Sequence, residues 1–257
     1  MVKEKLRYEN DVCFQINIGE EEVPEYDVLV AGFPGTGLIG GIASEQLINT
    51  LDLKQVASID CNEFPPTAVI FDGIPRRPVR FFAGEKFLLV KSDMVIPPEL
   101  SASLAKTIID FAVDNGVKEV IIFDGIPKRE REGEEDKDKV WGVLSSHAAK
   151  SEAEKLDLEI ISRGAISGIS SSLLLNAHEK KIKAVGMLAE GKPNMPDPRA
   201  SATLLQRFAD YRDIEIETKS LLESAEKLEE QYAQMVDQAN KAQKDMDRKS
   251  AHPPLYG

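Results

Sequence analysis

Short apolar runs rich in β-branched residues alternate with helical patterns from about Val12 to Ile216. The runs are apolar at successive positions, as in strands that are buried on both faces of a sheet. They lie at Asp27–Phe33, Thr67–Phe71, Phe87–Val90, Val120–Phe123 and Ala184–Leu188. Because alternating strands and helices build parallel sheets, the sequence predicts a single α/β domain with a mostly parallel central sheet flanked by helices on both faces.

The helical segments between these runs carry start and stop signals. Pro98 suits the first turn of a helix and Asn115-Gly116 suits its end. The apolar face of this helix comprises Leu100, Leu104, Ile108 and Phe111. Further helices are predicted at Leu173–His178 and Ala200–Tyr211, and we expect Ser170–Ser172 to cap the first of them.

The pentapeptide Phe-Asp-Gly-Ile-Pro occurs at Phe71–Pro75 and again at Phe123–Pro127, each time after an apolar run. Asp-Gly favours a turn, and proline prevents a strand from continuing. We therefore expect both copies to be tight exits from strands, lying near each other at one edge of the sheet. A catalytic role for their aspartates is the weaker interpretation, because neither copy has a partner base nearby in the sequence.

A glycine-rich loop follows the first apolar run. Gly35, Gly37 and Gly40 have the spacing G-x-G-x-x-G, between a predicted strand and a predicted helix. A helix amino terminus with exposed amides attracts anions, so this loop is a candidate nucleotide site. An acid about 20 residues further on would bind a ribose in such a site, and Asp52 or Asp60 could serve.

Other features of the loop favour a structural role. Pro34 removes one amide donor, and Asp52 lies in a predicted turn rather than at the end of the second strand. No lysine follows the glycines, so the loop is not of the Walker type. The structural alternative is a tight turn that needs glycine dihedrals and close packing of helix on sheet.

Patterns typical of catalysis or metal binding are absent from the sequence. The three His residues show neither metal-ligand spacing nor a Ser-His-Asp grouping. Gly164–Gly168 does not match the nucleophile elbow. Cys13 and Cys61 read as two buried, reduced thiols rather than as a zinc site or a disulfide framework. We expect no catalytic residue, no metal and no cofactor.

The chain is acidic, with 32 Lys and Arg against 44 Asp and Glu and a formal net charge of −12. Such a surface repels nucleic-acid backbones and anionic membranes, so neither is an expected partner. The charged first ten residues do not form a signal peptide, and no apolar run is long enough to span a membrane. We therefore expect a cytoplasmic protein.

The composition changes after Ile216, since residues 220–249 contain neither Gly nor Pro. Apolar or small residues recur there at spacings of four and three, as in a heptad seam. The seam comprises Leu221, Ala225, Leu228, Tyr232, Met235, Ala239, Ala242 and Met246. The sequence thus predicts a core over residues 1–217, an amphipathic helix over 218–250 and a tail over 251–257. The helix packs either on its own domain or, through Leu221, Leu228, Tyr232 and Met235, in an oligomeric bundle.

The tail ends in Leu255-Tyr256-Gly257, a hydrophobic residue, a penultimate tyrosine and a terminal residue with its carboxylate. Captured chain termini are an established mode of recognition. Pro253-Pro254 favours an extended approach and lowers the ordering cost of docking. This ending resembles the hydrophobic-Tyr-X motif by which activators and chaperones engage the 20S proteasome.

Several motifs in order strengthen that resemblance. They are Phe33–Gly40, Phe64-Pro65-Pro66-Thr67, Gly164–Leu174 and Pro196-Asp197-Pro198 with Ala200. Together they resemble the proteasome assembly chaperone 2 family in its archaeal homologues, over about Val28 to Phe208. The resemblance implies a domain related to the purine nucleoside phosphorylase class, no catalysis, a homo-oligomer and a glycine loop that serves the fold.

The resemblance also implies how the tail acts on the α-subunits of the 20S proteasome. Leu255 would fill an apolar groove between adjacent α-subunits, and Tyr256 would brace the gate region. The carboxylate of Gly257 would pair with a lysine. An oligomer that presents several tails would bind with avidity, whether to open the gate, to assist assembly of the α-ring, or both.

Overall fold

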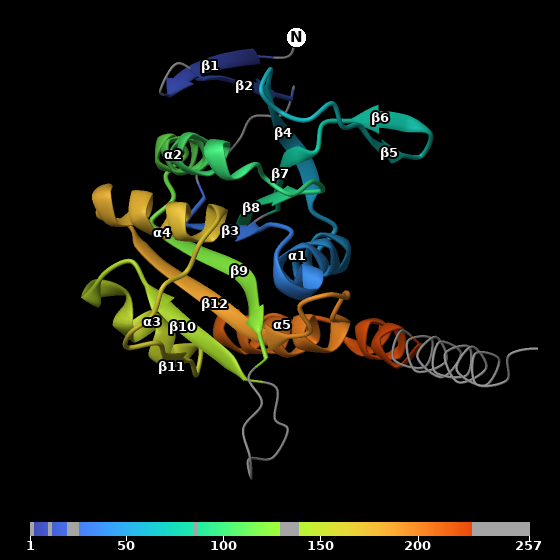
Figure 1. Ribbon diagram of the computed structural model, residues 1–257, viewed down its shortest axis with the longest axis vertical. Helices are drawn as coiled ribbons and strands as arrows, with labels where there is room; N and C mark the ends of the chain where they lie inside the picture. The colour runs from blue at the N-terminus through green and yellow to red at the C-terminus, as the bar shows by residue number, and fades with distance from the viewer. Residues whose placement is uncertain (1–2, 10–11, 20–25, 85–86, 129–138, 228–257) are drawn as a thin grey trace, which may run out of the picture.

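A ten-stranded mixed sheet runs through the molecule, in the order β1-β2-β4-β7-β8-β3-β9-β12-β10-β11 (Figure 1). The computed structural model describes residues 3–9, 12–19, 26–84, 87–128 and 139–227. The four central strands are parallel, and they are β8 (Phe87–Ser92), β3 (Val28–Gly32), β9 (Glu119–Pro127) and β12 (Lys183–Gly191). The expected parallel sheet is confirmed for these strands.

The flanks of the sheet are mainly antiparallel, which the sequence pattern did not predict. One flank comprises β1 (Lys3–Glu9), β2 (Val12–Ile18), β4 (Lys54–Cys61) and β7 (Val79–Ala83). The other flank comprises β10 (Val140–Leu144), antiparallel to β12, and the short β11 (Glu159–Ile160), parallel to β10. Short connections such as the one between β7 and β8 permit only antiparallel neighbours, because a parallel pair needs a long crossover.

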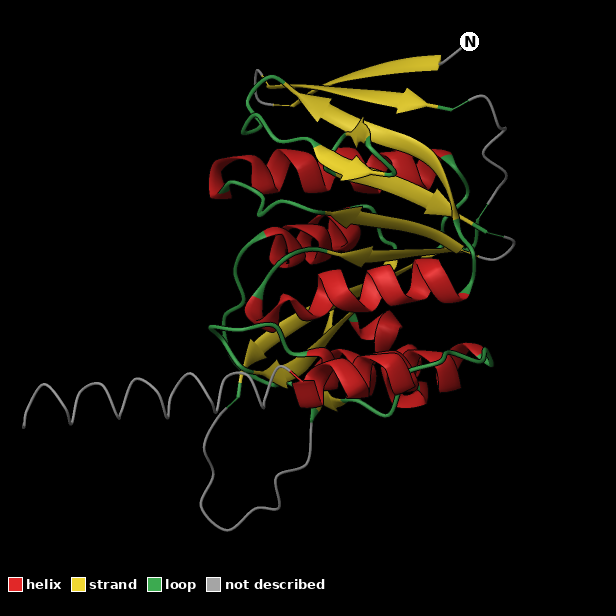
Figure 2. Cartoon of the chain, turned by 90° about the vertical axis from the view of Figure 1, so that its right-hand side faces the viewer, coloured by secondary structure: helices red, strands yellow, loops and turns green. Residues whose placement is uncertain are grey.

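Helices cover both faces of the central strands; Figure 2 shows them in red next to the yellow strands of the sheet. The main helices are α1 (Ile39–Thr50), α2 (Pro98–Asp114), α4 (Ile169–Glu179) and α5 (Pro198–Arg212). Alternate residues of β3 point to opposite sides: Leu29 and Ala31 pack with α2 and α4, whereas Val28 and Val30 pack with α1 and α5. The 3₁₀ turn η2 (His147–Ala149) and α3 (Lys150–Lys155) add to the α1 and α5 side.

The predicted limits of α2 are confirmed, whereas α5 begins two residues before its predicted start at Ala200. Helix α2 starts at Pro98 and is followed by Asn115, with Gly116 at a φ of +82°. Helix α5 starts at Pro198, and the side chain of Asp197 accepts the amide of Ala200 at 3.1 Å. These are the expected chemistries of a helix start and a helix stop.

The Thr67–Phe71 run does not form the buried central strand that its apolar character predicted. It becomes β5 (Val69–Phe71), which among the described strands pairs with β6 (Ile74–Arg76) alone, in a separate two-stranded ribbon that projects from the body (Figure 1). Asp72 and Gly73 form its turn with φ of 50° and 75°. A two-residue Asp-Gly link with positive φ at both residues closes a hairpin.

The start of the predicted carboxy-terminal helix packs on the body. Residues 219–227 are helical, and Leu221 is buried in the cluster that contains α1 and α5. Ala225 is buried as well, and the side chain of Gln46 donates to the carbonyl of Glu217 at 2.6 Å. The seam residues Leu228, Tyr232 and Met235 lie outside the described residues. Within the described ranges, no helix combines the length and the apolar character that crossing a membrane requires.

Candidate functional site

A hollow beside the glycine loop lies where the parallel strands β3 and β9 end. It has a volume of about 310 Å³ and is bounded by the loop that enters α1 and the segment that enters α4. Its walls come from Phe33–Thr36, Asp124–Pro127, Ala165–Ser170 and Leu188. Open α/β sheets bind ligands at the carboxyl ends of their strands, so this crevice is the candidate site of the described chain.

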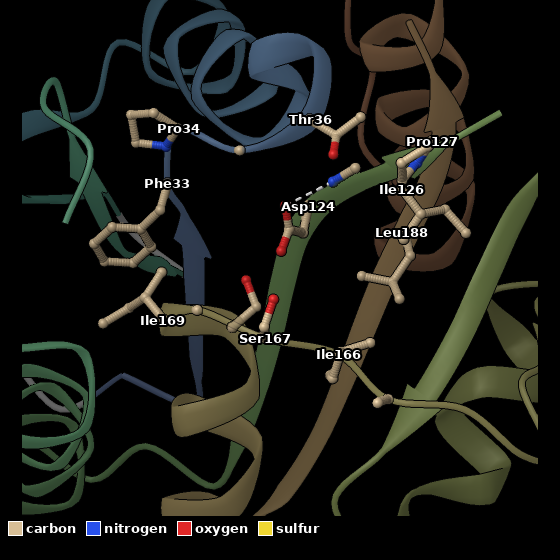
Figure 3. Close-up of a pocket in the computed structure, with 15 residues that line it drawn as sticks. Phe33, Pro34, Thr36, Asp124, Ile126, Pro127, Ile166, Ser167, Ile169 and Leu188 are labelled. Carbon is tan, nitrogen blue, oxygen red and sulfur yellow. Dashed lines mark hydrogen bonds between the residues drawn. The ribbon is translucent and has the colours of Figure 1, made fainter. Parts of the chain in front are cut away.

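Asp124 lies at the centre of the crevice, between the Phe33–Thr36 loop and the segment containing Ser167 and Ile169 (Figure 3). Its Oδ1 accepts the amide of Gly125 at 2.7 Å, and its carboxyl group also bonds to the side chain of Ser170. Desolvation by burial raises the pKa of Asp124 and outweighs these two hydrogen bonds. The carboxyl group is thus held towards its neutral form, in which it both donates and accepts hydrogen bonds.

The second Phe-Asp-Gly-Ile-Pro copy is therefore not the tight exit that the sequence predicted. Asp124 and Gly125 continue the strand, paired with Leu188 and Ala189 of β12. The first copy forms the turn of the projecting β5–β6 ribbon. The expectation that both copies leave the same edge of the sheet is wrong. The backbone of the second copy pairs with β12, whereas the first copy pairs with no described strand of the main sheet.

The glycine loop has the geometry of close packing. A Cβ atom at Gly40 would meet the carbonyl oxygen of Phe123, so glycine allows α1 to approach β9. Gly37 has a φ of +62° inside the 3₁₀ turn η1 (Thr36–Leu38), and α1 begins only at Ile39. A Cβ at Gly35 would lie 2.6 Å from Oδ1 of Asp124. An anion at this loop would therefore face a carboxyl group.

The acids proposed for a dinucleotide site lie away from this loop. Asp52 follows α1 in a turn and pairs with Lys54. Asp60 lies in β4, which β7 and β8 separate from β3, and it pairs with Arg77. In a dinucleotide-binding fold the acid ends a strand beside the glycine loop. The described geometry favours the structural interpretation of Gly35, Gly37 and Gly40.

Among the described residues, no histidine or cysteine lines the crevice. His178, in α4, bonds through Nδ1 to the carbonyl of Ser145 at 2.7 Å and does not line the crevice. No group of three or more His, Cys, Asp or Glu that could hold a metal occurs among the described residues. Cys61 is buried and Cys13 half-buried, and both are free thiols. The arrangement can hold a small polar molecule by hydrogen bonds to the carboxyl group of Asp124 and to the serine and threonine side chains of the crevice wall.

The prediction that Ser170–Ser172 cap the helix α4 was wrong. Helix α4 starts at Ile169, one residue before the first serine, and Gly168 precedes it with a φ of 79° and no side-chain cap. Ser171 instead donates its hydroxyl to the carbonyl of Gly168 at 2.8 Å. Ser170 turns inward to Asp124, a contact that the cap interpretation missed.

The residues predicted to bind a partner are not in the described part. Leu255, Tyr256 and Gly257 lie outside the described residues, as do Leu228, Tyr232 and Met235. Sequence reasoning favoured a turn role for Asp124 and kept a catalytic role as the weaker interpretation. Its position directly after a run that is buried on both faces was the available signal, since such runs end at the edge where ligand sites form.

Known proteins with a similar sequence or fold agree with the described architecture. The model of the PAC2 family matches residues 29–236. The crystal structure of Pyrococcus furiosus PbaA, described as an archaeal homolog of proteasome-assembly chaperone, is 30% identical with a TM-score of 0.78. That match covers 91% of this chain and 97% of PbaA.

Two further relatives extend this picture. The protein MJ0106 of Methanocaldococcus jannaschii is 29% identical over 232 residues, which cover 90% of this chain and 93% of MJ0106. Pyrococcus furiosus PbaB, described as an archaeal proteasome activator, is 22% identical with a TM-score of 0.74, over 86% of this chain and 98% of PbaB. At that identity the likeness to PbaB shows a shared fold.

Proposed function

The chain belongs to the PAC2 family, and from this premise we propose that it is a non-enzymatic, homo-oligomeric protein that docks its carboxy-terminal residues into the α-ring of the 20S proteasome. The description of PbaA as a homolog of a proteasome-assembly chaperone supports the general role. The observation that carries the finer proposal is the ending Leu255-Tyr256-Gly257 in a chain of this family.

Each tail residue has a defined part in the proposed docking. The side chain of Leu255 fills an apolar groove between adjacent α-subunits, where burial of a leucine contributes about 1.5–3 kcal/mol. Tyr256 packs its ring beside it and offers its hydroxyl to the gate region. The carboxylate of Gly257 pairs with a lysine of the pocket by a charge-assisted hydrogen bond.

A single tripeptide of this kind is a weak ligand, and the oligomer compensates for that weakness. Copies joined in one assembly present several tails at once, and the second tail then binds at a high effective concentration. Pro253-Pro254 stiffens the approach and lowers the entropy lost on docking.

The test compares three variants with the wild type: deletion of residues 255–257, Tyr256→Ala, and the control His252→Ala, which lies upstream of the two prolines. Co-sedimentation with 20S particles measures binding, and hydrolysis of a fluorogenic peptide measures gating. The deletion and Tyr256→Ala should lose at least tenfold in affinity, whereas His252→Ala should not. Unchanged binding by the deletion variant would rule out docking by the tail.

The same variants separate assembly from activation. An activator stimulates peptide hydrolysis by mature 20S particles, and a chaperone raises the yield of rings formed from isolated α-subunits. We propose that the tail is needed for either activity, because both begin with the same docking step.

A nucleotide-binding function at the glycine loop is the second candidate, and one observation favours it: Gly35 lines the crevice at the carboxyl ends of the parallel strands. A thermal-shift screen with ATP and dinucleotides tests it, since a bound ligand raises the midpoint of unfolding. Gly35→Ala is the matched variant, because it narrows the crevice at a residue whose φ is not in the left-handed region. We expect no shift; a saturable shift that Gly35→Ala abolishes would support a nucleotide site.

A further inference from the structure

The β5–β6 ribbon exposes apolar side chains on both of its faces. Phe71 pairs with Ile74 in its register and Ile70 pairs with Pro75, so neighbouring pairs point to opposite sides. Ile70, Phe71 and Ile74 are 64%, 59% and 51% exposed. An isolated two-stranded ribbon is marginally stable at best, and exposed apolar patches mark interaction sites. Phe71 and Arg76 also line a hollow against the body, but all three apolar side chains remain more than half exposed. The ribbon is therefore a candidate docking surface.

A complementary hollow lies on another part of the surface. It has a volume of about 430 Å³ and is lined mainly by apolar side chains of β10, of α4 and of the segment before α4. Its walls include Val143, Leu144, Ile166, Leu174 and Leu175. Leu175 is 64% exposed at its edge. We call this hollow the β10–α4 groove.

The ribbon and the groove cannot meet within one chain. Figure 1 places the ribbon and the elements β10 and α4 on opposite sides of the molecule, with the central strands between them. The ribbon is also anchored at its base, where Arg77 pairs with Asp60 of β4. Any contact between these two surfaces must therefore join different copies.

The charges beside the two surfaces are complementary. Arg76 ends β6, and Glu179 ends α4 beside the hollow next to the groove. In the described part of the chain, neither side chain has an ion-pair partner. An apolar ribbon that ends in a cation thus matches an apolar groove that has an anion next to it, a pairing that fixes orientation more than it adds affinity.

We infer that the β5–β6 ribbon of one copy docks in the β10–α4 groove of a second copy. The contact is heterologous, because one copy offers its ribbon and the other its groove. Repetition of such a contact closes into a ring if the rotation between copies permits. Each copy then covers both of its apolar surfaces, and Phe71 is the anchor that fills the groove.

This inference deepens the homo-oligomer on which the proposed function rests, but it does not depend on the tail. Deletion of residues 255–257 should leave the assembly intact. A stable assembly that fails to bind 20S particles would contradict the proposed function and leave the ribbon contact standing.

The test uses the full chain with Phe71→Asp, which disables the ribbon, and Leu175→Asp, which disables the groove. Val95→Asp is the control, because Val95 is 69% exposed and belongs to neither surface. Native mass spectrometry and light scattering measure the assembly, and circular dichroism checks that each variant is folded. Wild type and Val95→Asp should form the same oligomer. Each of the two disabled variants should have the 28.4 kDa mass of one chain.

Mixing the two disabled variants gives the decisive result. The intact ribbon of Leu175→Asp should enter the intact groove of Phe71→Asp, and the open ends should stop growth at a one-to-one dimer. A monomeric wild type, wild-type assembly by either disabled variant, or a mixture that stays monomeric would overturn the inference. As a second check, Arg76→Glu and Glu179→Arg should each weaken assembly at least threefold, and the double reversal should restore it.

Discussion

The segments Phe71–Pro75 and Phe123–Pro127 have the same five residues and different structures. The first closes an exposed ribbon, with Phe71 59% accessible to solvent. The second lies in the central sheet, where Phe123 is fully buried. Its ring packs edge-on against that of Phe208, with 5.2 Å between the ring centroids. The fold therefore assigns the two phenylalanines to opposite roles, one to the core and one to the surface.

The difference lies in what each backbone can pair with. Asp72 and Gly73 take positive φ values, as a two-residue hairpin requires. Asp124 and Gly125 stay extended because β12 offers them partners. A local turn preference is worth about 1 kcal/mol, and ladder hydrogen bonds with burial on both faces exceed it.

Replacing the two phenylalanines should give the largest contrast. Phe123→Ala should lower the free energy of unfolding by about 3–5 kcal/mol, because it leaves a cavity in the core. Phe71→Ala should change it by less than about 0.5 kcal/mol, since the side chain is exposed. Urea unfolding in the Leu175→Asp background measures both without a contribution from assembly. Equal costs for the two changes would break the comparison.

Replacing Gly125 and Gly73 by alanine should give a smaller difference in the free energy of unfolding. A Cβ atom at Gly125 would press against the carbonyl oxygen of Thr36, and Gly125→Ala should destabilise the body by about 1–3 kcal/mol. At Gly73 there is open space, but φ is +75°. Gly73→Ala should therefore strain only the ribbon, by about 1 kcal/mol. Hydrogen exchange distinguishes the two cases, because the second should loosen the ribbon amides while the central strands stay protected.

The two aspartates should give the smallest contrast, and it depends on pH. Burial raises the pKa of Asp124, so its stabilising contribution is present below the unfolded pKa and is lost as pH rises through the folded pKa. Asp124→Asn should match the wild type at the acidic end and exceed it at neutral pH by about 1 kcal/mol, or about 2–4 °C in Tm. Asp72→Asn, at the exposed turn, should leave Tm unchanged. A neutral-pH loss on Asp124→Asn would show that the carboxylate is needed.

Much of the central architecture could be predicted from the sequence. Runs such as Val120–Phe123 are buried on both faces, and Pro98 and Asn115 mark a helix that the structure confirms. The antiparallel flanks could not be predicted, because their pairing depends on long-range contacts and not on local periodicity. The prediction for the Thr67–Phe71 run was wrong for the same reason: its apolar residues occur here in an exposed ribbon, and composition does not distinguish such a ribbon from a core strand.

The candidate site was harder to predict than the fold. The glycines of Gly35–Gly40 indicated a special loop, but only the packing of Gly40 on Phe123 shows why glycine is needed there. Asp124 meets the glycine loop and Ser170 from distant parts of the chain, so no local pattern records that cluster. The docking tail stays a prediction, and it rests on a purely local signal of three residues and a carboxylate.

The free carboxylate of Gly257 is the most direct test of the central claim, because extending the chain removes it and keeps every side chain. Binding of the 20S proteasome is measured by biolayer interferometry for the wild type and for a chain extended by two alanines, with native mass spectrometry showing that both form the same oligomer. The account predicts at least a tenfold loss of affinity on extension. Equal affinity of the extended and wild-type assemblies would contradict it.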